Sequence, residues 1–204
     1  MLRRLLQLYI GLVLYGVSTA LFVHANLGAD PWDVFHLGVA KQLGISFGTV
    51  IILTGAAVLL LWIPIRQMPG LGTVSNVIVL GLAADATLAV LPPLESMVAR
   101  SALLVGAIVL NAIATGMYIG AGFGPGRRDG LMTGLHARTG WSLRGIRTAI
   151  ELSVLLIGWL LGGKFGVGTV IYALSIGPLI QLCLPWFSQP VSRNAVSPPR
   201  EIVS

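Results

Sequence analysis

The chain contains two copies of one sequence pattern, and the second copy lies 96 residues after the first. LGADPWDVFHLG (27–38) aligns without a gap with FGPGRRDGLMTG (123–134), and PGLGTV (69–74) aligns with FGVGTV (165–170). Identical residues recur at pairs that include Gly28/Gly124, Asp33/Asp129, Gly38/Gly134, Gly44/Gly140, Ser46/Ser142, Gly70/Gly166, Gly72/Gly168, Thr73/Thr169 and Gly81/Gly177. This duplication predicts a fold built from two similar halves, an architecture known from many transporters and channels.

Almost the whole chain is apolar enough for a membrane. Charged residues make up 10% of the 204 residues, too few to cover the surface of a soluble domain of this length. The first apolar stretch is interpreted as a span and not as a signal peptide, because it lacks a small-residue cleavage site and has a repeat partner. Hydropathy predicts six transmembrane helices in an all-α fold, each long enough to cross a bilayer, at residues 6–25, 46–64, 72–92, 101–121, 145–163 and 167–187.

These spans divide the chain into a first repeat (1–92), a second repeat (93–187) and a polar, Pro- and Ser-rich tail (188–204). We expect the tail to be disordered and cytoplasmic. Each repeat would cross the membrane three times. Because three is an odd number, the two repeats must face opposite ways and form an inverted pair.

The basic residues indicate how the chain is oriented. With the N-terminus in the cytoplasm, Lys41, Arg100 and Lys164 fall on the outer side. The cytoplasmic side receives Arg3, Arg4, Arg66, Arg127, Arg128, Arg138, Arg144, Arg147, Arg193 and Arg200. This asymmetry follows the positive-inside rule and predicts that both termini are cytoplasmic. Because topology explains the positive charge, we expect the lipid bilayer as a partner and no nucleic acid.

Two short segments, residues 31–44 and 127–140, are too short and too polar to span. Asp30, Pro31 and Asp33 are typical of a helix start, because the acids accept bonds from free backbone amides and proline needs no donor in the first turn. One interpretation is a re-entrant half-helix that directs its positive dipole end at a central cavity. The other is an interfacial helix that lies flat, with Trp32 at the head-group level.

These short segments supply most candidate residues for a solute or ion pathway. Both repeats retain an aspartate at the same position, Asp33 in the first and Asp129 in the second. Either helix capping or a symmetric pair of functional carboxylates would explain this. The other candidates are Trp32, His36, Arg127, Arg128, Thr73 and Thr169. Asp85 is the first candidate for an interior acid, because it has no basic neighbour at helical spacing and burying an ionisable group in hydrocarbon is costly.

Two GxGT motifs begin the third and sixth predicted spans. Gly70 and Gly72 in the first motif, and Gly166 and Gly168 in the second, permit a sharp reversal and close packing. The threonine hydroxyls can cap the turn that follows. The alternative is a pair of exposed helix N-termini that contact a solute or ion.

The sequence holds no motif that anchors catalysis. It has no nucleophile elbow, no phosphate-binding loop and no dinucleotide fingerprint. Asp33 and His36 have the spacing of two ligands on one helix face, but no third ligand accompanies them. We therefore expect no enzyme activity, no cofactor and no metal site.

The segment LGADPWDVFHLGVAKQLGISFGT, followed by an apolar span and PGLGTV, resembles the YczE/YitT family of small bacterial integral membrane proteins, the YczE branch especially. The resemblance covers about the first 185 residues and is best marked over Gly28–Thr49 and Pro69–Gly81. It implies a location in the bacterial plasma (inner) membrane without naming an activity. Because only a short polar tail follows, we expect no counterpart of the soluble C-terminal domain of the YitT branch.

Two functions remain open from the sequence. The first is a transporter or channel for a small anionic or zwitterionic solute, bound between the repeats, with Asp33 and Asp129 flanking the site and Asp85 inside it. The second is a membrane scaffold or regulatory protein without transport activity, whose arginines dock a partner or lipid. For a transporter or channel a homodimer would be unsurprising, since six helices give a thin wall around any pathway.

Overall fold

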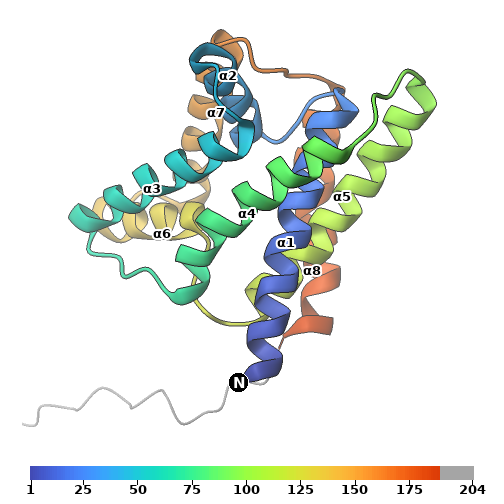
Figure 1. Ribbon diagram of the computed structural model, residues 1–204. Coiled ribbons are helices and arrows are strands. Elements are labelled where there is room, and N and C mark those ends of the chain that lie inside the picture. Colours follow the sequence, from blue (N-terminus) through green and yellow to red (C-terminus); the bar gives the residue numbers. More distant parts are fainter. Residues whose placement is uncertain (189–204) are drawn as a thin grey trace, which may run out of the picture.

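The computed structural model describes residues 1–188, and all the regular structure in this range is helical (Figure 1). The all-α prediction is therefore confirmed for the described residues, whereas the predicted tail beyond Ser188 lies outside them. The helices are α1 (Leu2–Ala25), α2 (Pro31–Leu43), α3 (Phe47–Ile65), α4 (Leu71–Val90), α5 (Met97–Gly120), α6 (Arg127–Thr139), α7 (Leu143–Leu160) and α8 (Val167–Phe187).

The helix order repeats as the sequence does. In each half a long helix is followed by a 13-residue helix and then by two helices of 18–21 residues. The bounds of α2 and α6 differ by the same 96 residues at both ends. The two sequence copies therefore give two copies of one helix pattern.

Five helices, α1, α3, α4, α5 and α8, are long and apolar enough to cross a membrane. The sequence predicted six such spans, and α7 is the one that falls short. It has 18 residues and carries Arg144, Arg147 and Glu151, so it is more polar than its counterpart α3. Large apolar side chains such as Leu60, Leu152 and Leu174 are more than half exposed, as expected of a surface that faces lipid.

The N-termini of the helices follow from local sequence. Asp30 precedes α2, and its carboxylate accepts a bond from the backbone N–H of Asp33 at 2.7 Å. Ser46 precedes α3 and accepts from the N–H of Thr49 at 3.1 Å. Such side chains satisfy backbone donors that the first helical turn leaves free.

The core of the molecule is the pair α1 and α5, which run antiparallel (Figure 1). Near the start of α1, Arg4 Nε donates to the carbonyl of Ala121 just after α5, at 3.0 Å. Near the end of α1, Phe22 shares a buried cluster with Leu104 in the first half of α5. Within the two halves, α4 packs against α1 and α8 packs against α5.

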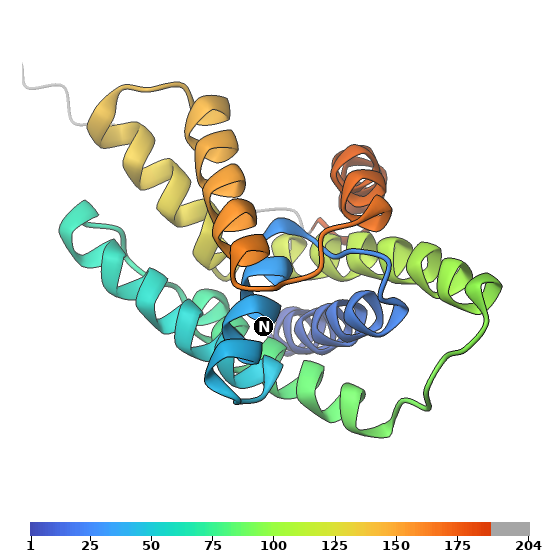
Figure 2. The same cartoon turned by 90° about the horizontal axis from the view of Figure 1, so that it is seen from above.

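The remaining helices exchange partners between the halves. Helix α2 packs on α7, and α3 packs on α6 (Figure 2). Two backbone hydrogen bonds connect the halves reciprocally: Gly72 N–H donates to the carbonyl of Phe123 at 2.9 Å, and Gly168 N–H donates to that of Leu27 at 2.8 Å. These four residues are two repeat-related pairs, so the same contact is made twice.

Candidate functional site

A cavity of about 390 Å³ lies between the two halves. Both halves line it, because its walls come from α1, α4 and the start of α2 on one side and from α5, α6, α7 and α8 on the other. Side chains of Tyr15, Asn76, Thr115, Tyr118 and Tyr172 contribute aromatic and hydrogen-bonding surface. This volume falls in the range of about 300–1,000 Å³ that is typical of small-molecule sites.

The starts of the two short helices meet at this cavity. Arg128 of α6 forms an ion pair with Asp30, which caps α2, with 2.8 Å between Nη1 and Oδ2. The same guanidinium lies over the ring of Trp32, 5.0 Å from its centroid. Asp30, Pro31 and Trp32 thus join one wall with residues 127–129 of the other repeat. Arg128 is held by protein partners and is not free for a ligand.

Arg127 differs from its neighbour because its charge has no protein counter-ion within hydrogen-bonding distance among residues 1–188. The residue is 2% exposed and lines the cavity, and its Nε and Nη1 atoms have no hydrogen-bond partner in the described structure. Gly55 of α3 leaves the space, since a Cβ there would lie 3.1 Å from Arg127 Nη1. Burial, and then the nearby Arg128, lower the pKa of Arg127 to about 10, so it keeps its positive charge at neutral pH.

The sequence counted Arg127 and Arg128 as cytoplasmic loop charges, and the structure corrects this interpretation. Arg127 is buried and the side chain of Arg128 is only 21% exposed. They belong to the interior site, so the asymmetry of basic residues is smaller than the sequence indicated.

Asp33 and His36 form a buried pair on α2, with 3.3 Å between Asp33 Oδ1 and His36 Nδ1. Rings of Trp32, Phe35 and Phe47 surround the imidazole. Burial raises the pKa of Asp33, and Asp30 adds to this shift, whereas burial and the two arginines lower the pKa of His36. Both shifts favour the neutral forms. Neither residue lines the cavity directly.

Asp129, the repeat partner of Asp33, lies in a different environment. Its side chain is exposed and forms part of the cavity wall. The two acids that the repeats share are therefore not equivalent in this structure, because one is buried beside His36 and the other faces the cavity.

Thr73 and Thr169 are buried in the first turns of α4 and α8. The hydroxyl of Thr73 accepts from Gly70 N–H at 3.2 Å and donates to the carbonyl of Pro125 at 2.7 Å. Thr169 accepts from Gly166 N–H at 3.4 Å. Each GxGT motif packs against a glycine of the other half, Gly124 (φ +120°) or Gly28 (φ +111°), where only glycine adopts the backbone conformation without strain. These threonines hold loops and do not line the cavity.

Asp85 lies outside the cavity, at the contact between α3 and α4. Its carboxylate accepts from Gly48 N–H at 2.6 Å and from the hydroxyl of Ser46 at 2.5 Å. Asp85 thus acts as a second cap for the N-terminus of α3. It is partly exposed, so the structure does not place it as an interior charge beside Asp33 and Asp129.

Sequence reasoning did not single out Tyr15 or Gly55, although both help to form the site. Their repeat partners give the missing signal. Tyr15 aligns with Asn111, so both repeats carry a hydrogen-bonding residue at this point of their first helix. Gly55 aligns with Glu151, which lines the cavity from α7.

A bundle with five helices apolar enough to cross a bilayer, an apolar exterior and a polar internal cavity is a membrane protein. The chain belongs to DUF6198, a protein family of unknown function whose model matches residues 2–185.

The chain is 37% identical over 177 residues to an uncharacterized protein of Haemophilus influenzae, covering 87% of this chain and 81% of that protein. It is 30% identical over 179 residues to the uncharacterized membrane protein YczE of Bacillus subtilis, covering 87% and 83% of the two chains. The resemblance to the YczE branch is therefore confirmed. No solved structure matches the chain.

Proposed function

We propose that the protein transports a small solute across the bacterial plasma membrane, without changing it chemically, by binding it in the cavity between two inverted repeats. The observation that carries this proposal is the unequal packing around the cavity. Helices α3 and α4 are closely packed, whereas α7 and α8 are not packed together and both line the cavity. A central site with one closed and one open side is the arrangement that alternating access requires.

The inverted arrangement has support in the reciprocal contacts of the two halves and in the antiparallel pair α1 and α5. In this proposal α7 is the sixth membrane-crossing segment. Its polar residues Arg147 and Glu151 line the cavity, so they need not face lipid.

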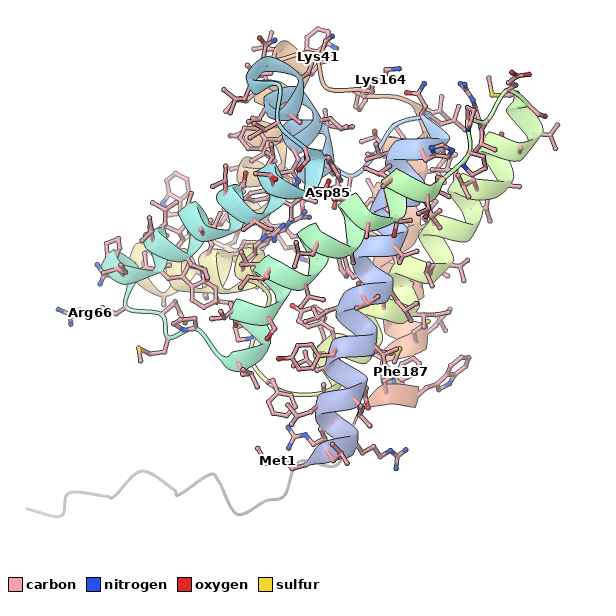
Figure 3. All side chains as sticks on the ribbon, viewed as in Figure 1. Met1, Lys41, Arg66, Asp85, Lys164 and Phe187 are labelled. Carbon is pink, nitrogen blue, oxygen red and sulfur yellow. The ribbon has the colours of Figure 1, made fainter. Side chains whose placement is uncertain are left out.

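The proposed orientation places both termini in the cytoplasm. Met1 and Phe187 lie at one end of the molecule, and Lys41 and Lys164 lie at the opposite end (Figure 3). Gln7 Nε2 near the start of α1 donates to the carbonyl of Phe187 at 2.9 Å, which fixes the two ends of the described chain together.

The scaffold alternative loses part of its basis. It required the arginines to dock a partner, but Arg127 is buried and Arg128 is paired with Asp30. Arg138 and Arg144 remain exposed for such contacts. A homodimer through the exposed apolar faces is compatible with transport and is proposed only as an assembly state.

The test begins with a thermal-shift screen of the purified protein against metabolites and ions, since a ligand of the native state raises the melting temperature by mass action. Ligands that bind are then offered to proteoliposomes, and uptake is measured. We expect uptake above that of empty liposomes, at least tenfold lower in Arg127→Gln and unchanged in the exposed-site control Arg144→Gln. A ligand that binds but shows no flux in any orientation or gradient would argue against transport.

A further inference from the structure

We infer that the cavity binds the carboxylate or other oxyanion group of a small organic acid, with Arg127 and Trp32 as the principal donors. This inference names the substrate class of the proposed function. It rests on the proposed function only because both concern the same cavity. The evidence is the set of buried polar atoms at the cavity that the described protein leaves without partners.

These atoms are almost all donors. They are Nε and Nη1 of Arg127, Nε1 of Trp32 and the hydroxyl oxygen of Thr115. All three residues line the cavity and each is less than a tenth exposed. A buried donor without an acceptor is destabilising, and a buried charge more so. An occupant of the cavity would remove this penalty by supplying acceptors.

The chemistry of the donors selects the occupant. A guanidinium and an indole N–H can only donate, so the occupant must carry acceptor oxygens at this point. The charge on Arg127 calls for a negative group, because the neighbouring Asp30 is already paired with Arg128. Arg127 is also the first residue of α6, where the positive end of the helix dipole adds to the attraction for an anion. Planar oxyanions accept two parallel bonds from a guanidinium, which makes a carboxylate a good fit.

The other cavity walls suit an organic body. Tyr15, Tyr118 and Tyr172 offer aromatic surface, and Asn76 offers an amide. Two acids also line the cavity: Glu151, paired with Arg147 at 3.0 Å, and Asp129. They disfavour a second negative charge in the cavity, so we expect a single oxyanion group. An ammonium group on the same molecule would meet Asp129.

Binding is tested on the full-length protein in detergent, using sodium benzoate, glycine, inorganic phosphate and, as a neutral match for benzoate, benzamide. Thermal shift and calorimetry give the dissociation constants. We expect benzoate or glycine to bind and benzamide to bind at least tenfold more weakly. Saturation by benzamide at the same concentration as benzoate would overturn the inference.

Three substitutions remove the donors one at a time: Arg127→Gln, Trp32→Phe and Thr115→Val. We expect the dissociation constant to rise more than tenfold for the first and severalfold for the other two. The matched controls are Arg144→Gln and Trp159→Phe, which alter exposed residues outside the cavity. If Arg127→Gln does not fold, Arg127→Lys replaces it, because lysine keeps the charge and loses the fork of donors. Unchanged affinity in the folded cavity variants would overturn the assignment.

An oxyanion could also come from a lipid head group that enters from the bilayer. The measurement is therefore repeated in nanodiscs of phosphatidylcholine and of phosphatidylglycerol. Competition of phosphatidylglycerol with benzoate supports the oxyanion site and assigns lipid as its source. The outcome is separable from that of the transport proposal: anion binding without flux supports this inference alone, whereas flux of a cation or neutral solute without anion binding supports transport and overturns this inference.

Discussion

Helices α3 and α4 in the first half and α7 and α8 in the second occupy equivalent places in the repeat, but only the first pair is closely packed. At the α3–α4 contact, Gly48 and Gly81 allow the two backbones to approach. A Cβ on Gly81 would lie 2.5 Å from the carbonyl oxygen of Gly48. Asp85 then bonds to Ser46 and Gly48 across the same contact.

The second half keeps only part of this arrangement. Gly177 corresponds to Gly81, and nothing lies within 4 Å of a Cβ built there. Arg144 replaces Gly48, and Gln181, which lines the cavity, replaces Asp85. The comparison indicates that Gly48, Gly81 and Asp85 let α3 and α4 pack closely. Two of the three, Gly48 and Asp85, are replaced in the second half, where α7 and α8 are not closely packed.

The largest effect should come from preventing the closed pair from separating. Ser46→Cys and Asp85→Cys, combined with Cys183→Ser, place two thiols across the α3–α4 contact, where a disulfide or a short bifunctional reagent can join them. If the site alternates, cross-linking should lower flux by more than tenfold and reduction should restore it. Full flux through the cross-linked protein would show that α3 and α4 do not open.

A smaller effect distinguishes the two repeat-related glycines. Gly81→Ala overpacks the α3–α4 contact and should destabilise the protein by about 1–3 kcal/mol. Gly177→Ala meets open space and should be neutral or stabilising by up to about 1 kcal/mol, because alanine favours a helix. Melting temperatures of the two variants provide the measurement. Equal losses in both would mean that the α7–α8 side is closed in solution.

The smallest effect is the loss of stability at acidic pH that His36 causes. Because the pKa of His36 is lowered in the folded protein, the unfolded chain binds more protons between that pKa and the ordinary value of 6.5. Stability through His36 is therefore present above pH 6.5 and falls as the pH drops below it, by at most about 1.4 kcal/mol per pH unit. The raised pKa of Asp33 makes its contribution to stability change with pH in the opposite direction. This contribution is present in both the wild type and the His36→Gln variant. We expect His36→Gln to lose less melting temperature than the wild type between pH 7 and pH 5; parallel curves would contradict this.

The sequence predicted the helical class, the two halves and the short helices, because hydropathy and an internal repeat are properties of the chain alone. The sixth predicted span corresponds to α7, which carries Arg144, Arg147 and Glu151 and is not among the five helices apolar enough to cross a membrane. Hydropathy does not reveal that Arg147 and Glu151 line a cavity. The family resemblance also came from local motifs.

The site was less accessible to sequence reasoning. Arg127 and Arg128 sit beside each other in a polar segment, and only the packing of α3 against α6 reveals that Arg127 is buried. The hydrogen-bond partners of Asp85, Gly48 and Ser46, lie 37 and 39 residues away in the chain. A search for partners at helical spacing considers only residues three or four positions away. Contacts between distant segments therefore decided which charged residues meet.

The most direct test compares the two sides of the cavity in one experiment. Spin labels at residues 53 and 78 report the α3–α4 distance, and labels at the equivalent residues 149 and 174 report the α7–α8 distance; all four positions are exposed. Electron–electron double resonance should give a longer distance for the second pair in the empty protein. Added solute should then shorten the α7–α8 distance. It should also produce a population of molecules in which the α3–α4 distance is longer. Equal distances in the two pairs, or distances that no solute changes, would contradict the account.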